Sequence, residues 1–259
     1  MSSEVETSLE VSGFRRRFLD SARNDKGPQA PRPLFADLTI YHDENPHSAA
    51  MNMAIDEALL EMAVVPTIRF YRWRSPALSF GYFGKFSDVA IYTAERDLVR
   101  RWTGGGIVFH GDDLTYSIVI PASDPVFDES SIAIYEKIHR ALCGALAGHN
   151  QGAELVTVGN QLRAGGRGSC DNACFANPVR ADVMMDGRKI AGAAQRRNRR
   201  GLLQQGSIHG FAMKTNLAQK FAQALSANCS EFEANEEIFR RARGFAQQKY
   251  GTESWQRRR

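Results

Sequence analysis

Residues 179–194 read VRADVMMDGRKIAGAA and contain a strong turn signal. Asp186 and Gly187 are residue types that tolerate positive φ at both central positions of a two-residue hairpin turn. We therefore predict a β-hairpin with arms at 179–185 and 188–194. If the turn has two residues, Met184 lies opposite Lys189, and Asp182 lies diagonally on the same face.

Further strand and helix patterns extend on both sides of this hairpin. Apolar runs predict strands at 35–42, 67–74, 77–82, 114–121 and 202–209. Apolar residues at helical spacing predict helices at 49–64, 91–99, 130–149, 216–227 and 233–249. The strands come in adjacent antiparallel groups with helices between the groups. This order predicts an α+β architecture and not a doubly wound parallel sheet.

Composition indicates how the chain is divided into domains. It has 259 residues, of which 43% are hydrophobic and 24% charged, as in ordinary globular proteins. Residues 1–33 are polar, contain a basic run at 15–17 and have prolines at 28, 31 and 33. Such a segment buries little apolar surface, so we expect a mobile N-terminal extension at 1–33 and one folded domain at 34–259.

The same composition bounds the location and the metal chemistry. The apolar runs are far shorter than the roughly 20 residues that span a bilayer. The first thirty residues are rich in acidic side chains and lack an apolar core, unlike secretory or transit peptides. Four cysteines are too few for a disulfide framework, and no C-x-x-C pair or histidine cluster indicates zinc. We expect a cytoplasmic protein with reduced thiols, no bound metal and no contact with a membrane.

A glycine-rich segment reads RRWTGGGIVFH at 100–110. Consecutive glycines let the main chain approach a ligand and turn its amides towards it, while paired arginines can contact anions. The segment is neither a Walker A loop nor a G-x-G-x-x-G motif. A tight structural loop also uses such glycines, but the flanking arginines and His110 favour a ligand site.

Cys174 lies in the segment ACFANP at 173–178, just before the hairpin. A thiol near ammonium and guanidinium groups has a lowered pKa, and its thiolate is the reactive species. Taken alone, Cys174 also fits a small buried side chain, and Lys189 fits a solvent-facing one. Their joint position beside Gly192 favours a nucleophilic site, in which Cys170 is the main competitor of Cys174.

Four motifs follow one another along the chain: MNMAIDEALL at 51–60, YRW and SFGY within 71–82, the glycine-rich segment at 100–110, and DGRKIAG at 186–192. This order resembles the biotin/lipoate protein ligase and octanoyltransferase superfamily, and the match runs from about 34 to 208. The resemblance implies an α+β biotinyl/lipoyl-transferase fold with a larger mixed sheet, a smaller sheet and surrounding helices. It identifies 34–259 as the catalytic domain of a lipoate-attachment enzyme.

The resemblance also implies roles for single residues. An acyl-binding pocket would be lined by an arginine, three glycines and a histidine, which are Arg101, Gly104, Gly105, Gly106 and His110. Lys189 would contact the acyl carbonyl. We add Asp182 and Gly192 to the substrate-binding residues, and we predict Cys174 and Lys189 as the catalytic pair.

Two activities remain open within this superfamily. A transferase would move an octanoyl or lipoyl group from acyl carrier protein through a Cys174 thioester to a lysine of a lipoyl domain. An ATP-dependent lipoate-protein ligase would act through lipoyl-AMP. The segment around Cys174 favours the transferase, as does Ala181, which precedes Asp182 where ligases often have asparagine. About fifty residues follow Ile208, too few for the extra domain that many ligases carry.

These alternatives imply different partners and cofactors. The transferase needs no cofactor. ATP and magnesium are required only if the chain is a ligase. An acidic acyl carrier protein would find a docking site on four arginines, which are Arg196, Arg197, Arg199 and Arg200. We expect no nucleic-acid partner, because aromatic residues do not interleave with this cluster. Biotin ligation and a catalytically silent relative are less favoured.

Overall fold

The computed structural model of the chain describes residues 33–111, 113–147, 152–156, 180–210 and 216–258. Apart from Pro33, the predicted extension at 1–33 lies outside the described residues. The same holds for Cys170 and Cys174. Among the described helices, none is long and apolar enough to cross a membrane.

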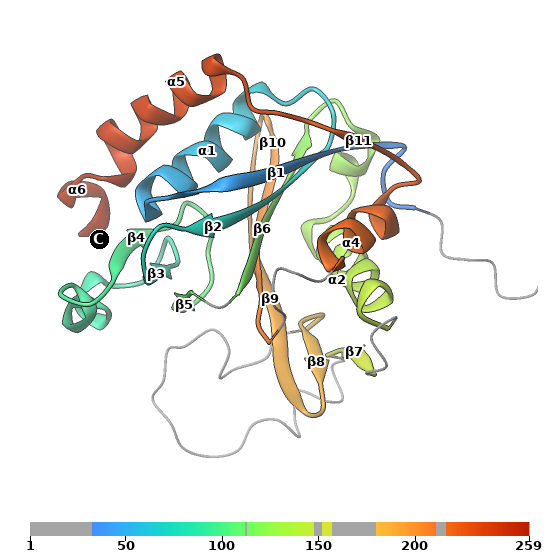
Figure 1. Ribbon diagram of the computed structural model, residues 1–259, viewed down its shortest axis with the longest axis horizontal. Coiled ribbons are helices and arrows are strands. Elements are labelled where there is room, and N and C mark those ends of the chain that lie inside the picture. Colours follow the sequence, from blue (N-terminus) through green and yellow to red (C-terminus); the bar gives the residue numbers. More distant parts are fainter. Residues whose placement is uncertain (1–32, 112, 148–151, 157–179, 211–215, 259) are drawn as a thin grey trace, which may run out of the picture. The chain divides into compact units, whose positions relative to one another are not determined.

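The larger sheet is mixed, as expected (Figure 1). Its order is β11-β1-β2-β6-β10-β9-β8-β7. The strands are β1 (Asp37–His47), β2 (Thr67–Trp73), β6 (Leu114–Pro121), β7 (Ala153–Leu155), β8 (Val183–Met185), β9 (Arg188–Asn198), β10 (Gly201–Ile208) and β11 (Asn228–Glu231). Strand β1 pairs in parallel with β2 and β11, whereas β6 pairs antiparallel with both β2 and β10. The prediction missed the short strands β7 and β11.

The smaller sheet has the order β4-β3-β5 and consists of β3 (Ala77–Phe80), β4 (Asp97–Arg100) and β5 (Val108–His110). The predicted helix at 91–99 is wrong. Two 3-10 turns, η1 (Phe86–Asp88) and η2 (Ala90–Tyr92), precede β4, which pairs in parallel with β3. The Asp97 carboxylate also accepts a hydrogen bond from the first amide of α1, at Ala49, over 2.7 Å. These tertiary contacts override the local apolar pattern.

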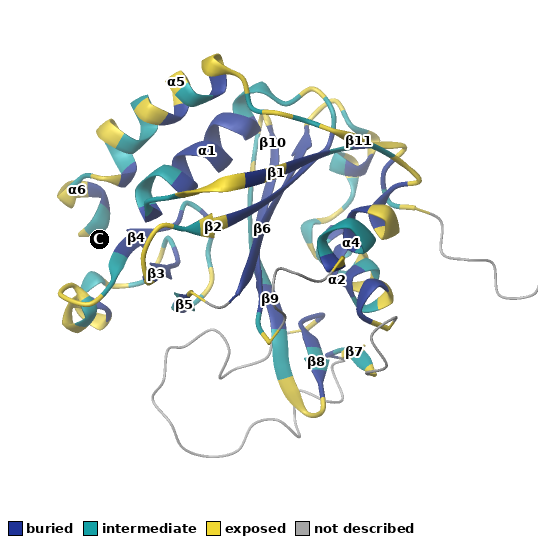
Figure 2. Cartoon of the chain, in the orientation of Figure 1, coloured by how far each residue is buried: buried dark blue, intermediate teal, exposed yellow. Residues whose placement is uncertain are grey.

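Helices cover both faces of the larger sheet (Figure 1). The helices are α1 (Ala49–Met62), α2 (Ser131–Ala147), α4 (Leu217–Leu225), α5 (Glu236–Phe245) and α6 (Glu253–Gln256); η3 (Pro125–Asp128) and a π-helical turn (Ala246–Tyr250) complete the set. Successive residues of β10 face opposite sides: Leu202 packs with α2 and α4, and Leu203 packs with α1 and α5. Accordingly, the central strands are buried along most of their length (Figure 2).

Helix α1 is held to the sheet by a buried charge network. Arg69 on β2 is fully buried and donates to Asp43 over 2.7 Å and to Asp56 on α1 over 2.8 Å. Burial by itself would lower the pKa of Arg69, but the two carboxylates raise it above its ordinary value. Asp56 also accepts from Ser117 and from Gln205, so one carboxylate joins α1 to three strands.

The predicted hairpin turn is confirmed, although the strands differ from the predicted arms: β8 is shorter and begins at Val183, and β9 is longer and ends at Asn198. Asp186 has a φ of 50° and Gly187 a φ of 73°, so the turn has positive φ at both central residues. Met184 pairs with Lys189 as expected, and a register shift then brings Val183 opposite Ala191. The hairpin therefore directs Asp182 and Lys189 towards the same site.

Candidate active site

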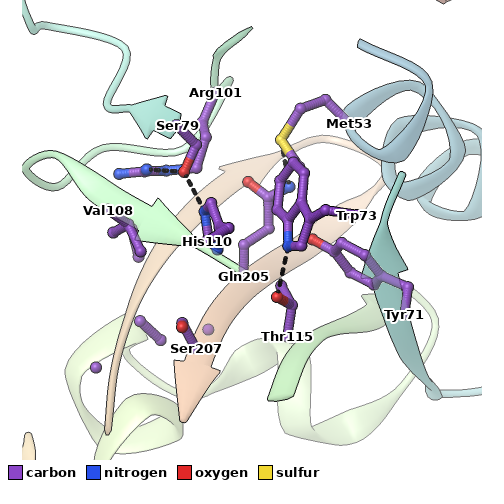
Figure 3. A pocket seen from close by; sticks show the side chains of 14 residues that line it. Met53, Tyr71, Trp73, Ser79, Arg101, Val108, His110, Thr115, Gln205 and Ser207 are labelled. Carbon is purple, nitrogen blue, oxygen red and sulfur yellow. Dashed lines mark hydrogen bonds between the residues drawn. The ribbon is translucent and has the colours of Figure 1, made fainter. Parts of the chain in front are cut away.

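A pocket lies between the smaller sheet, α1 and the β9–β10 pair (Figure 3). It encloses about 420 Å³, including the space at its open mouth. Three of the predicted site residues line it: Arg101, His110 and Gly192. The other lining residues come from six strands and α1, and they are Met53, Tyr71, Trp73, Ser79, Val108, Thr115, Ala193, Ala194, Gln205, Gly206 and Ser207.

One wall of the pocket is a chain of polar side chains. The Arg101 Nη1 atom donates to Ser79 Oγ over 2.7 Å, and Ser79 Oγ lies 2.7 Å from His110 Nε2. Because a guanidinium can only donate, the Ser79 hydroxyl is free to donate its own proton to His110. Burial, together with the nearby Arg101 guanidinium, lowers the pKa of His110, so its imidazole is neutral at neutral pH.

Asp113 holds this wall from behind. Its Oδ2 atom accepts from His110 Nδ1 over 2.8 Å, from Thr115 over 2.8 Å and from Ser207 over 2.6 Å. Burial by itself would raise the pKa of Asp113, but His110 and the donors around the carboxylate keep it well below its usual range. Trp73 donates to Thr115 and stacks on His110 with ring centroids 4.1 Å apart. Sequence reasoning missed Asp113 and Ser79, although Asp113 follows His110 at a spacing of three residues.

The glycine-rich segment shapes the wall through Arg101. Arg101 Nη2 donates to the carbonyl oxygens of Gly104 and Gly106 over 2.9 Å and 2.8 Å. Gly105 has a φ of 86°, and a Cβ on Gly81 would lie 2.0 Å from the Gly105 oxygen. Glycine is therefore required at both positions. None of the three loop glycines lines the pocket directly.

Lys189 and Asp182 form a buried ion pair at one edge of the pocket. Their charged atoms are 2.7 Å apart, and their side chains are 2% and 0% exposed. Tyr135 donates to the other carboxylate oxygen of Asp182 over 2.6 Å. A Cβ on Gly192 would lie 2.9 Å from Lys189 Nζ, so the missing side chain makes room for the ammonium. Lys189 itself is not a lining residue, but it lies directly behind Gly192.

The predicted nucleophile Cys174 lies outside the described residues, and so does its competitor Cys170. Two cysteines are described, Cys143 and Cys229, and neither lines the pocket. Burial raises the pKa of the Cys143 thiol to about 11, and burial also raises that of Cys229. Both are uncharged thiols at neutral pH and poor nucleophiles. In the part of the chain that the structure describes, no cluster of His, Cys, Asp or Glu could hold a metal ion.

The basic cluster is partly engaged within the chain. The Arg196 guanidinium lies 5.1 Å from the centroid of the Trp102 ring, a cation–π contact. Arg197 donates to two backbone carbonyls, and Arg200 lies 3.7 Å from Glu61. Since Arg197, Arg199 and Arg200 are exposed, these arginines remain a predicted docking surface for an acidic protein.

Solved structures share the fold of this chain. The protein Ta0514 of T. acidophilum, solved with bound lipoic acid, has a TM-score of 0.65 at 22% identity, over 86% of this chain and 98% of that one. Lipoate-protein ligase A bound with ATP has a TM-score of 0.63 at 21% identity, over 86% and 98%. Together with the two sheets described above, these similarities confirm the predicted α+β fold.

Relatives with curated names are closer in sequence. Octanoyltransferase LipM of Oceanobacillus iheyensis is 39% identical over 176 residues, which are 64% of this chain and 62% of the relative. Octanoyltransferase LipM of Clostridioides difficile is 37% identical over 180 residues, 65% of this chain and 64% of the relative. The chain thus spans less than two thirds of the length of these relatives.

A family match covers the pocket and all four sequence motifs. It extends over residues 48–242 and is described as the lipoyl protein ligase A/B catalytic domain. Its range begins just before α1 and ends within α5, so it includes both sheets apart from β1. Since it spans most of the chain, the chain belongs to the lipoyl protein ligase A/B catalytic domain family.

Proposed function

We propose that the catalytic domain at 34–259 transfers an octanoyl group from acyl carrier protein to a lysine of a lipoyl domain. The observation that carries this proposal is the pocket, which is lined in part by aromatic and aliphatic side chains and has the buried Lys189 ammonium behind Gly192. A partly apolar pocket with the Arg101 guanidinium in its lining and the Lys189 ammonium close behind it suits a medium-length acyl chain that ends in a polarised carbonyl. Similarity to octanoyltransferases named LipM supports the same reading.

The proposed chemistry passes through an acyl-enzyme. The Cys174 thiolate attacks the thioester carbonyl, the bond to the carrier thiol breaks, and the acyl group moves to Cys174. Lys189 stabilises the negative charge that develops on the carbonyl oxygen in this step. The acceptor lysine then attacks the new thioester, and an amide forms as Cys174 leaves. Because the donor is already activated, no step requires ATP or a metal.

The ATP-dependent ligase is the second candidate, and similarity to lipoate-protein ligase A bound with ATP favours it. One feature of the site speaks against it. Ala181 has a φ of 65°, a left-handed conformation that asparagine adopts more readily than alanine. Ligases often have asparagine at this point of the resemblance. The backbone shape is thus present here without the amide side chain.

One assay separates the two candidates. Apo lipoyl domain is incubated with octanoyl carrier protein after apyrase has removed ATP, and the acylated product is measured by mass spectrometry. We expect transfer without ATP, loss of transfer in Cys174→Ala, and normal transfer in the control Cys143→Ala. Transfer that needs free acid with magnesium ATP, and that Cys174→Ala leaves unchanged, would make the chain a ligase.

A further inference from the structure

The polar wall of the pocket contains a hydroxyl, an imidazole and a carboxylate in series. Ser79 Oγ lies 2.7 Å from His110 Nε2, and His110 Nδ1 lies 2.8 Å from Asp113 Oδ2 (Figure 3 shows the first contact). Ser79 and His110 both line the pocket. We propose that Ser79, His110 and Asp113 form a proton relay that deprotonates the amine attacking the bound acyl group. This inference rests on the proposed function and adds a catalytic base to it.

The three groups are arranged for proton transfer in one direction. Arg101 donates to Ser79 Oγ over 2.7 Å, which stabilises negative charge on that oxygen and favours release of its proton towards His110. The Asp113 carboxylate accepts a hydrogen bond from His110 Nδ1–H. This interaction keeps Nε2 unprotonated and available as the proton acceptor. Asp113 therefore acts as a positioning residue, whereas Ser79 is the group that would touch the amine.

The groups around His110 keep its imidazole unprotonated at neutral pH. The ionisable groups that face it are Arg101, Arg96, Asp113 and, through Ser207, His209. Burial and the two guanidinium groups lower the pKa of His110, although Asp113 acts in the opposite direction. Burial also lowers the pKa of His209, so that ring adds no positive charge at neutral pH. At neutral pH the unprotonated His110 imidazole can therefore act as a base.

An acceptor lysine needs such a base. Its ordinary pKa is about 10.4, so at neutral pH it arrives as an ammonium ion without a lone pair. The ammonium gives a proton to Ser79 Oγ while Ser79 gives its own proton to His110 Nε2, and the imidazolium pairs with Asp113. The neutral nitrogen then attacks the thioester carbonyl, a C–N bond forms and the C–S bond breaks. The second nitrogen proton goes to the departing thiolate, and His110 returns its proton to solvent through Ser79.

The test compares two acceptors in the intact chain. One is the lysine of an apo lipoyl domain, and the other is hydroxylamine, whose nitrogen is uncharged at neutral pH and needs no base. We expect Ser79→Ala to slow transfer to the lysine by about 100- to 10,000-fold, the usual contribution of general base catalysis. Transfer to hydroxylamine, corrected for the enzyme-free rate, should be retained. Ser79→Thr, which keeps the hydroxyl, should recover transfer to the lysine.

A second variant tests whether Asp113 positions His110. Asp113→Asn should reduce transfer to the lysine and move the acid limb of its pH profile, while transfer to hydroxylamine persists. Ser87→Ala is the matched control, because Ser87 is exposed and does not line the pocket. Thermal unfolding of each variant identifies any loss of folded protein.

The outcomes separate this inference from the proposed function. Equal losses with both acceptors, or full activity of Ser79→Ala with the lysine, would overturn the relay. If the unmodified chain transfers nothing from carrier protein, the proposed function fails instead. The same two acceptors are then compared with the acyl adenylate as donor, and the relay makes the same prediction there.

Discussion

Lys189 is a predicted catalytic residue that also forms a buried ion pair with Asp182. Both side chains are almost fully buried, and their charged atoms are 2.7 Å apart. Asp182 also accepts a hydrogen bond from Tyr135. Burial of the tyrosine and the nearby carboxylate both raise the pKa of Tyr135. A buried carboxylate that loses its cation is costly, because desolvation is no longer offset. Activity lost on substitution of Lys189 therefore has to be separated from loss of folding.

We expect Lys189→Met to slow acyl transfer by about 100- to 1000-fold, as for loss of one group that stabilises an oxyanion. The same substitution should lower the free energy of unfolding by about 3 to 5 kcal/mol, because Asp182 stays buried without its ammonium partner. The double variant Lys189→Met/Asp182→Asn removes both charges and should recover most of that stability. Urea unfolding and turnover are measured on each protein. Recovery of activity along with stability would show that Lys189 is only structural.

At the scale of elements, one buried arginine fixes the position of α1 on the sheet. Arg69 on β2 bonds to Asp43 on β1 and to Asp56 on α1, and its guanidinium lies 4.0 Å from the centroid of the Tyr71 ring. Asp56 in turn accepts from Gln205, which lines the pocket. The position of Met53 on the same helix, another lining residue, therefore follows from this network.

We expect Arg69→Met to destabilise the fold by about 3 to 5 kcal/mol, since it leaves two buried carboxylates without a cation. The matched control is Arg140→Met on α2, where the arginine is exposed and paired with Glu136 one turn away. Such a surface pair changes the free energy of unfolding by no more than about 0.5 kcal/mol. Both free energies come from urea unfolding. Similar values for the two variants would contradict the role of the buried network.

At the scale of the whole molecule, buried neutral histidine couples stability to pH. His139 on α2 is fully buried, donates to the Ala181 carbonyl over 2.6 Å and lies 3.1 Å from the Tyr116 hydroxyl. Burial lowers its pKa to about 4. The unfolded chain has a pKa of about 6.5 at this residue and therefore binds the proton more readily than the folded chain.

Stability from His139 is thus present above about pH 6.5 and is lost as the pH falls towards 4. The difference in pKa corresponds to about 3 kcal/mol. Urea unfolding across this pH range should show a shallower loss for His139→Gln, which keeps polar atoms at the site and does not titrate. A loss of the same steepness in both proteins would mean that other groups cause the acid sensitivity; candidates are His110 and His209, whose pKa values burial also lowers.

The hairpin and the long elements could be predicted because their signals are local. Asp186-Gly187 specifies its own turn, and the spacing of apolar residues in α1, α2 and β6 shows which face each element buries. The motif order also indicated the pocket, of which Arg101, His110 and Gly192 proved to be lining residues. The roles assigned to Cys174 and Lys189 stay predictions until the variants are measured.

Tertiary structure alone decided the rest. Residues 97–100 carry too short a pattern to distinguish helix from strand, and pairing with β3 made them a strand. Ser79, Asp113 and Ser207 meet in one hydrogen-bonded wall although 34 and 94 residues separate Asp113 from the other two (113 − 79 and 207 − 113). A polar residue in a strand has the same local signal whether it faces solvent or a buried carboxylate. Only the long-range packing of two sheets turns these separate side chains into a site, because burial is what makes each of them require a partner.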